Sequence, residues 1–232
     1  MDENELVISY SLIGDYDNVK IEIENGADIH INNDEAIRTA ASSGHFNIVK
    51  LLFEAGANIH IDDEYVLRIG AQHGNCDIVK FALENGADIH AITDYALQYS
   101  SRNGHYEIVN LLIEVGADIH ANEENAIINA SMSGHYNIVK LLLERGAKPH
   151  CKAVKWAIAF GYYNIIKLLI DNGADIRGNN KMIVNIMNRQ VKEDILVLLV
   201  NNGLDIHTDN EYLLKKMVRW DNHDIVKLLL DQ

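Results

Sequence analysis

Apolar residues recur along the chain in short runs that fit one face of a helix. In the clearest run, residues 48–53 are apolar except for Lys50, and Glu54 follows that lysine by one helical turn. This spacing predicts an amphipathic helix with a lysine–glutamate pair on its wet side. Gly56 stands just after the last apolar residue, where helices commonly end in a left-handed conformation that glycine adopts most easily.

A second, shorter helix is predicted just upstream, at residues 35–43. Ile37, Ala40 and Ala41 would form its packed face, and the small alanines would let neighbouring helices approach closely. Gly44 separates the two helices. Each unit is therefore expected to be a helix, a tight turn, a second helix, a glycine stop and a short extended loop.

This unit repeats along the whole chain. The closing glycines stand 30 residues apart, except for one step of 27 residues, at Gly26, Gly56, Gly86, Gly116, Gly146, Gly173 and Gly203. A fixed period in this range indicates stacked supersecondary units, none of which buries its apolar face alone. We expect one domain over residues 1–232, with units at about 5–30, 34–60, 64–90, 94–120, 124–150, 151–177, 181–207 and 211–232.

The unit resembles the ankyrin repeat. The matching residues are Gly44-His45 at the turn, then Ile48-Val49-x-Leu51-Leu52, then Gly56-Ala57-Asn58, and they recur in register. The resemblance implies an all-α ankyrin-repeat solenoid of about eight helix-turn-helix units. The family unit usually has about 33 residues, so the shorter unit here implies shortened β-finger loops. The short unit ending in Asp-Ile-His looks most like ankyrin proteins of giant amoebal DNA viruses, the mimivirus group.

Charge and composition narrow the choice of partner. The chain has 232 residues, 48% of them hydrophobic, which argues against disorder. Its net charge is −14, from 34 acidic and 20 basic residues, so it should repel phosphate backbones and anionic lipid. We therefore expect no nucleic-acid partner and no membrane association. The alternative interpretation is that the charge only keeps an elongated protein in solution.

An intracellular, cytoplasmic location is expected. The N-terminus is acidic and lacks the layout of a signal peptide, and no apolar run is long enough to span a membrane. The two cysteines, Cys76 and Cys151, lie in non-adjacent units and should remain unpaired in a reducing compartment. If the viral resemblance holds, that compartment is the host cytoplasm.

Acidic residues begin four predicted first helices, at Asp34, Glu64, Asp94 and Glu124. We expect them to cap the helix and to interact favourably with its dipole. This repeated chemistry accounts for much of the negative charge without a partner.

Histidine is the one residue that suggests a metal array, at His30, His60, His90, His120, His150 and His207. Zinc ligands must lie about 2.0–2.1 Å from one ion, whereas equivalent positions on packed helices lie about 8–10 Å apart. One histidine per unit therefore builds no shared site, and local hydrogen bonding is the expected role. No metal and no cofactor are predicted.

No pattern of catalytic residues is present. The histidines after the turn glycines, such as His45 and His105, have no nucleophile at an activating spacing, and no phosphate loop or metalloprotease motif occurs. The chain is therefore predicted not to be an enzyme, and only a deep pocket with convergent titratable groups would favour one.

The best-supported candidate site is a binding groove. In the ankyrin family the first helices line the concave face, and the resemblance implies that Arg38, Arg68, Gln98, Ile128, Lys155, Asn185 and Lys215 point outward there. Nearby positions hold Tyr65, Tyr95, Arg102, Trp156, Tyr212, Arg219 and Trp220. Because Tyr, Trp and Arg commonly anchor protein interfaces, these residues predict a partly basic, aromatic groove. The alternative is scattered surface residues and core aromatics, with Trp156 simply packed.

The predicted function is non-catalytic protein–protein interaction, with a partner segment that carries acidic and apolar residues. The viral resemblance would make the chain an adaptor that acts on host proteins. The alternative is a structural component that self-assembles through its solenoid ends. The C-terminal unit would then self-associate, since the apolar helix predicted at 224–230 has no polar cap after it. Fraying of that end is the simpler interpretation.

Overall fold

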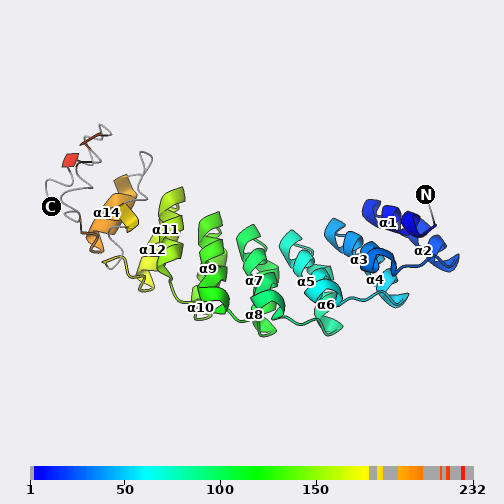
Figure 1. The fold of residues 1–232 in the computed structure, drawn as a ribbon. Helices are drawn as coiled ribbons and strands as arrows, with labels where there is room; N and C mark the ends of the chain where they lie inside the picture. Colours follow the sequence, from blue (N-terminus) through cyan, green and yellow to red (C-terminus); the bar gives the residue numbers. More distant parts are fainter. Residues whose placement is uncertain are drawn as a thin grey trace. The chain divides into compact units, whose positions relative to one another are not determined.

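A computed structural model describes residues 3–177, 182–184 and 193–205, together with Lys215, Val218, Arg219, Val226 and Lys227. These residues form α-helices joined by short turns, and none of them lies in a β-strand. The expectation of an all-α repeat stack without a projecting β-finger is thereby confirmed for this part of the chain (Figure 1). The eighth predicted unit falls almost entirely outside the described residues.

The helices come in pairs, as predicted. The first helices are α1 (Glu3–Ile13), α3 (Ile31–Ser43), α5 (Ile61–His73), α7 (Ala91–Asn103), α9 (Ala121–Ser133) and α11 (Cys151–Phe160). The second helices are α2 (Tyr16–Glu24), α4 (Phe46–Glu54), α6 (Cys76–Glu84), α8 (Tyr106–Glu114), α10 (Tyr136–Glu144), α12 (Tyr163–Asp171) and α14 (Glu193–Asn201).

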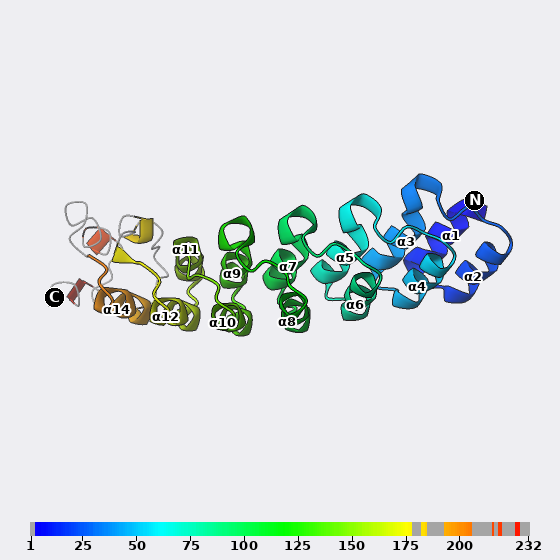
Figure 2. The same ribbon diagram turned by 90° about the horizontal axis from the view of Figure 1, so that it is seen from below.

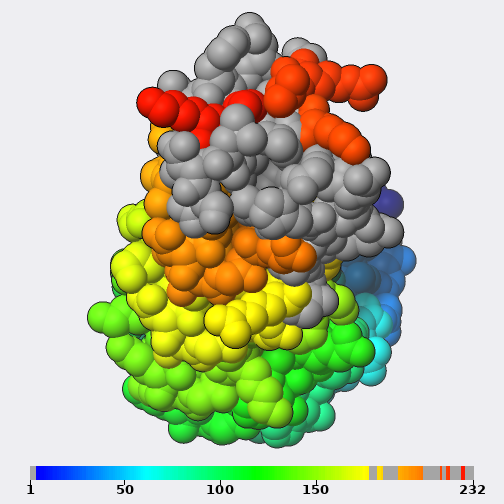
Figure 3. Space-filling model, turned by 90° about the vertical axis from the view of Figure 1, so that its left-hand side faces the viewer, coloured from blue at the N-terminus to red at the C-terminus, as the bar shows by residue number. Residues whose placement is uncertain are grey.

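The chain divides into two compact units, Met1–Ala121 and Asn122–Gln232. In the first unit, α1, α3, α5 and α7 pack in one row, and α2, α4, α6 and α8 pack in a second row (Figure 2). In the second unit, α12 contacts both α10 and α14, and α14 (orange) lies against the yellow part of the chain in Figure 3.

The apolar faces predicted from the sequence form the core between the rows. Ile37, Ala40 and Ala41 on α3 are fully buried, and so are Val49 and Leu52 on α4. The alanines allow the first helices to approach one another, while the branched and leucine side chains fill the space between the two rows. Each pair covers the apolar face of its neighbour, which is why stacking is required for stability.

Near the start of α3, α5, α7 and α9, within the bounds given above, the backbone has a feature that the sequence did not predict. Three consecutive residues there, 32–34, 62–64, 92–94 and 122–124, have positive φ values between 48° and 65°. A left-handed non-glycine residue costs about 1–2 kcal/mol, so neighbouring groups must hold this turn. We call it the left-handed turn.

The acidic residue at the end of each left-handed turn lies in the first turn of its helix, as the sequence predicted. Asp34, Glu64, Asp94 and Glu124 are almost completely buried. The left-handed backbone carries the carboxylate into the interior, where it meets groups of other segments. Asp94 Oδ1 accepts a hydrogen bond from the backbone N–H of Asp118 at 2.8 Å, in the loop that ends the same repeat after α8.

The same tie across one repeat occurs in the second unit. Glu124 Oε2 accepts from the backbone N–H of Lys148 at 3.1 Å. Because a buried carboxylate without partners would be costly, these bonds make the left-handed turn at the start of a repeat and the loop at its end depend on each other.

The loop histidines complete these contacts. Nδ1 of His30, His60 and His90 lies 2.8–3.0 Å from the carboxylate four residues later. The predicted role in local hydrogen bonding is confirmed for these three histidines.

The 27-residue step between Gly146 and Gly173 removes the left-handed turn. In place of that turn, His150 has an extended backbone, and its ring Nδ1 accepts from the N–H of Lys152 to cap α11. The shorter repeat therefore enters its first helix directly.

Gly14, Gly74 and Gly134, which are turn glycines between paired helices, lie beneath a ring of the next repeat. Gly74 has φ +83°, and a Cβ added there would lie 2.7 Å from Cε1 of His105. His105 Nε2 in turn lies 3.0 Å from the carbonyl oxygen of Gln72. Gly134 approaches the Tyr162 ring in the same way. Glycine is thus required both by the backbone angle and by the close approach.

We predict that Gly74→Ala lowers the free energy of unfolding more than Gly56→Ala does. Both glycines have positive φ, but a Cβ at Gly56 would meet nothing within 4 Å. The control, Gly56→Ala, should lower the free energy of unfolding by about 1–2 kcal/mol because of its backbone conformation. Gly74→Ala should lower it by a further 1–3 kcal/mol or so because of the clash with His105. Urea unfolding measures both losses, and equal losses would contradict the packing argument.

We also predict that Asp94→Ala is destabilising by about 1–3 kcal/mol, since the N–H of Asp118 then loses its acceptor. Asp94→Asn keeps an acceptor oxygen and should lose less. Thr93→Ala, at an exposed left-handed position, measures the backbone contribution alone. Thermal or urea unfolding compares the three variants, and an Asp94→Ala loss no larger than that of Thr93→Ala would refute the tie.

Candidate protein-binding surface

The two predicted arginines of the first unit hold the left-handed turns. Arg38 donates from Nε to the carbonyl of Asn33 at 3.0 Å and from Nη2 to that of Asn32 at 2.7 Å. Arg68 donates to the carbonyls of Asp63 and Asp62, both at 2.7 Å. These carbonyls are left without helical partners by the left-handed backbone, and the forked guanidinium satisfies two at once.

The expectation that every residue at this register points outward is wrong for Gln98 and Ile128, which are both buried. Gln98 donates from Nε2 to the carbonyl of Thr93 at 2.5 Å, the same task that Arg38 and Arg68 perform. The position lies over the turn, so its side chain is drawn to the turn carbonyls rather than to solvent. An arginine there still exposes part of its guanidinium, whereas the shorter glutamine is covered.

Aromatic and cationic side chains gather on α5 and α7. The rings of Tyr95 and Tyr99 stack with their centroids 4.0 Å apart and their planes at 14°. Arg68 lies 5.2 Å from the centroid of Tyr95, and Arg102 lies 6.0 Å from that of Tyr99. We call these four residues the Tyr95–Tyr99 cluster. The structure thus brings together the predicted Arg68, Tyr95 and Arg102.

A hydrogen bond fixes the cluster on α5. The Tyr95 hydroxyl donates to Gln72 Oε1 at 2.7 Å. The pKa of Tyr95 is raised above its usual value, first because burial disfavours the phenolate and then because Tyr99 lies beside it, while Arg68 opposes the rise. The neutral, hydrogen-bonded phenol is therefore the form that the surface presents.

Sequence reasoning missed Tyr99. Its signal was available, because residues four apart lie on one helix face and Tyr99 follows Tyr95 by that spacing. Tyr65, which was predicted, lies half-buried on α5 in the same register as Tyr95 on α7.

The second unit carries a separate aromatic cluster on α11. Lys155 Nζ lies 5.4 Å from the centroid of Trp156. The Trp156 ring is 6.1 Å from that of Phe160, which is 6.0 Å from that of Tyr162. Phe160 is 54% exposed and was not predicted, although it follows Trp156 by one helical turn. Trp156 is half-buried, so it both packs and contributes to the surface.

The remaining predicted residues lie near the C-terminus. Lys215 and Arg219 are exposed. Asn185, Tyr212 and Trp220 lie outside the described residues, and so does most of the helix predicted at 224–230.

No sign of catalytic or metal chemistry appears in the part of the chain that the structure describes. No group of three or more His, Cys, Asp or Glu side chains there is placed to hold a metal ion. None of the described helices combines the length and the apolar character that crossing a membrane requires. The surface is suited to contact through stacked rings and guanidinium groups rather than to bond making.

Comparisons with known proteins agree with this geometry. The family description that matches is "Ankyrin repeats (3 copies)", over residues 6–93, 67–153 and 97–180. Among solved structures, the human ASB11 ankyrin repeat domain is similar with a TM-score of 0.72 and 21% sequence identity, covering 83% of this chain and 96% of that one. At this identity the likeness concerns the fold alone.

No curated protein sequence matches the chain significantly. The comparisons lend no support to the viral resemblance, which rests only on the style of the short unit. The family matches span most of the chain, and together with the stacked helix pairs they show that this protein belongs to the ankyrin-repeat family.

Proposed function

We propose that the protein is a non-catalytic protein–protein interaction module that binds its partner on the first-helix face, with the Tyr95–Tyr99 cluster as the anchor. Ankyrin repeats are in general protein-binding modules, and the family match is the general support. The observation that carries the proposal is the stacked tyrosine pair with an arginine over each ring. Tyrosine and arginine are the side chains most often found at the energetic centre of interfaces.

The cluster is already ordered before any partner arrives. Arg68 is fixed by two carbonyls and Tyr95 by Gln72, so binding would freeze few additional rotamers. Half-exposed rings offer apolar area, and the guanidinium groups attract carboxylates. The partner segment that fits this chemistry carries acidic and apolar residues.

The narrower interpretation, an adaptor of viral origin that acts on host proteins, depends on the resemblance of the short unit alone and stays a prediction. Self-assembly through the solenoid ends also stays a prediction, because the C-terminal helix that suggested it lies outside the described residues.

Affinity measurements on cluster variants test the proposed surface. Arg38 and Arg68 are unsuitable targets because they hold the left-handed turns, so the variants are Tyr99→Ala and Arg102→Glu. A random peptide library is first selected against the wild-type chain, and the enriched peptide is then titrated. Each variant should weaken binding by about 10-fold or more, as hot-spot residues do, whereas Lys80→Glu on α6 carries the same charge change on an exposed site and should have little effect.

Circular dichroism and thermal unfolding confirm that the variants are folded. If both cluster variants bind every selected peptide as tightly as the wild type does, the first-helix face is not the binding surface.

A further inference from the structure

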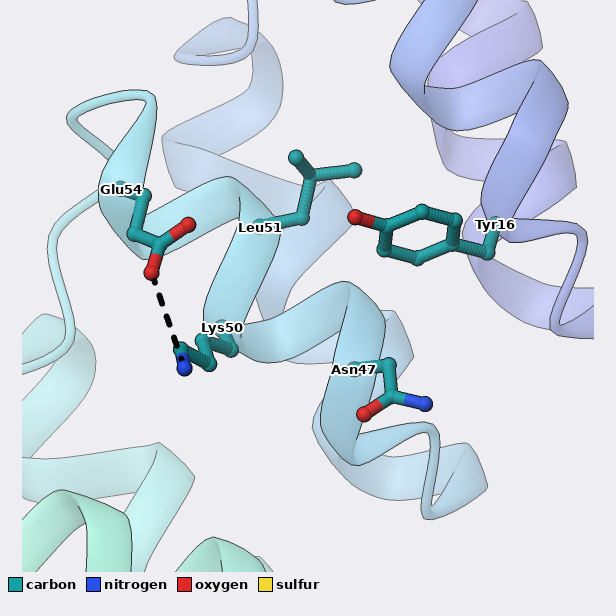
Figure 4. A pocket seen from close by; sticks show the side chains of 5 residues that line it. All are labelled: Tyr16, Asn47, Lys50, Leu51 and Glu54. Atoms are coloured by element: carbon teal, nitrogen blue, oxygen red, sulfur yellow. Dashed lines mark ion pairs between the residues drawn. The ribbon is translucent and has the colours of Figure 1, made fainter.

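The row formed by the second helices carries a groove that the proposed function does not use. Between α2 and α4 there is a hollow of about 370 Å³ lined by Tyr16, Asn47, Lys50, Leu51 and Glu54. We call it the α2–α4 groove. Figure 4 shows Tyr16 extending from α2 with its hydroxyl toward Leu51, while Lys50 and Glu54 lie together on the other edge of α4.

The equivalent space between the next two helices is filled by the chain's own side chain. Phe81 on α6 stands at the position that Leu51 occupies on α4, counted from the first residue of each helix. Its ring makes edge-to-face contacts with Phe46 at 5.7 Å and 77° and with Phe53 at 5.4 Å and 89°. Phe46 and Phe53 in turn correspond to Tyr16 and Ile23 on α2.

This internal comparison identifies what the α2–α4 groove accepts. One wall is again an aromatic ring and an apolar side chain, but the smaller Leu51 does not reach across as Phe81 does. Aromatic rings favour edge-to-face contacts of the kind that Phe81 makes. An aromatic side chain from outside can occupy the same place relative to Tyr16.

The edge of the groove adds a preference for positive charge. Glu54 lines the groove and is exposed at the C-terminal end of α4, where the helix dipole is already negative. Its partner Lys50 also lines the groove, with Nζ 3.9 Å from Oε1 of Glu54 on exposed surface, so this pair is weak. In a chain of net charge −14, a basic residue beside the aromatic anchor is the complementary choice.

A second groove of the same register occurs within the other unit. It lies between α12 and α14, holds about 620 Å³, and is lined by Tyr163, Glu193, Asp194, Val197, Leu198 and Asn201. Tyr163 and Leu198 repeat the places of Tyr16 and Leu51, while the acidic Glu193 and Asp194 lie at the start of α14 and Asn201 takes the place of Glu54.

We propose that the α2–α4 groove is a second docking site, which takes an aromatic side chain followed by an arginine or lysine from a partner protein. The aromatic ring lies against Tyr16 and Leu51, as Phe81 lies against its own neighbours. The basic residue meets Glu54. The partner's chemistry differs from that of the acidic segment expected on the first-helix face, so the two surfaces can be occupied independently.

The test is a titration of the ¹⁵N-labelled full chain with the peptide acetyl-Gly-Ser-Phe-Arg-Ser-Gly-amide, followed by amide chemical shifts. We expect saturable shifts at Tyr16, Asn47 and Leu51. The matched peptides with Leu in place of Phe, or Glu in place of Arg, should produce clearly smaller shifts at the same concentrations. Equal shifts with all three peptides, or no shifts around Tyr16 and Leu51, would overturn the proposal.

Two variants test the comparison between the two spaces: one fills the α2–α4 groove, and the other opens the equivalent space between α4 and α6. Leu51→Phe places a ring where Phe81 has one, so it should keep the thermal stability of the wild type and weaken peptide binding at the α2–α4 groove about tenfold or more. Phe81→Leu removes the internal ring and should add saturable shifts at Phe46 and Phe53. Unchanged binding by a folded Leu51→Phe chain, or no new shifts in Phe81→Leu, would count against the groove.

Discussion

Each helix pair keeps its apolar face dry only by packing against the next pair, and the rest of the structure depends on that constraint. The buried faces of α3 and α4, with Ile37, Ala40 and Leu52 at their centres, pack on each other and also against the neighbouring repeats. Hydrophobic burial gives this contact strength but little directional precision. The left-handed turns, buried carboxylates and loop histidines supply the precision, since their hydrogen bonds fix the turn at the start of a repeat against the loops on either side of its helix pair.

The same constraint explains why residues with a structural role also lie on the proposed binding surface. The left-handed turn exposes carbonyl groups without helical partners, and the residue that reaches back to them is Arg38, Arg68 or Gln98. Where it is an arginine, the guanidinium also lies at the surface, and in Arg68 it lies over Tyr95. A side chain recruited to stabilise a turn is thereby positioned rigidly for recognition. Because of this, changes at Arg68 alone cannot separate folding from binding.

The second helices show how different side chains at equivalent positions of successive repeats create different surfaces. Phe81 fills the space between α4 and α6, whereas Leu51 leaves a hollow between α2 and α4. The three facing positions carry Tyr16, Ile23 and Leu51 in one place and Phe46, Phe53 and Phe81 in the other, so the difference follows from the side chains. Repeat proteins can therefore vary recognition one position at a time without altering the stack.

The sequence by itself determined the period, the paired helices, their apolar faces and the turn glycines, because each follows from spacing along the chain at residues such as Ile48, Leu52 and Gly44. It also placed Tyr95, Arg68 and Arg102 correctly on one face. The left-handed turns, the burial of Asp94 and Gln98, and the stacking of Tyr99 on Tyr95 were decided only by the tertiary structure. Those features depend on groups that stand far away in the sequence, such as the N–H of Asp118, 24 residues after Asp94, and that become neighbours only when the helix pair between them folds back on itself.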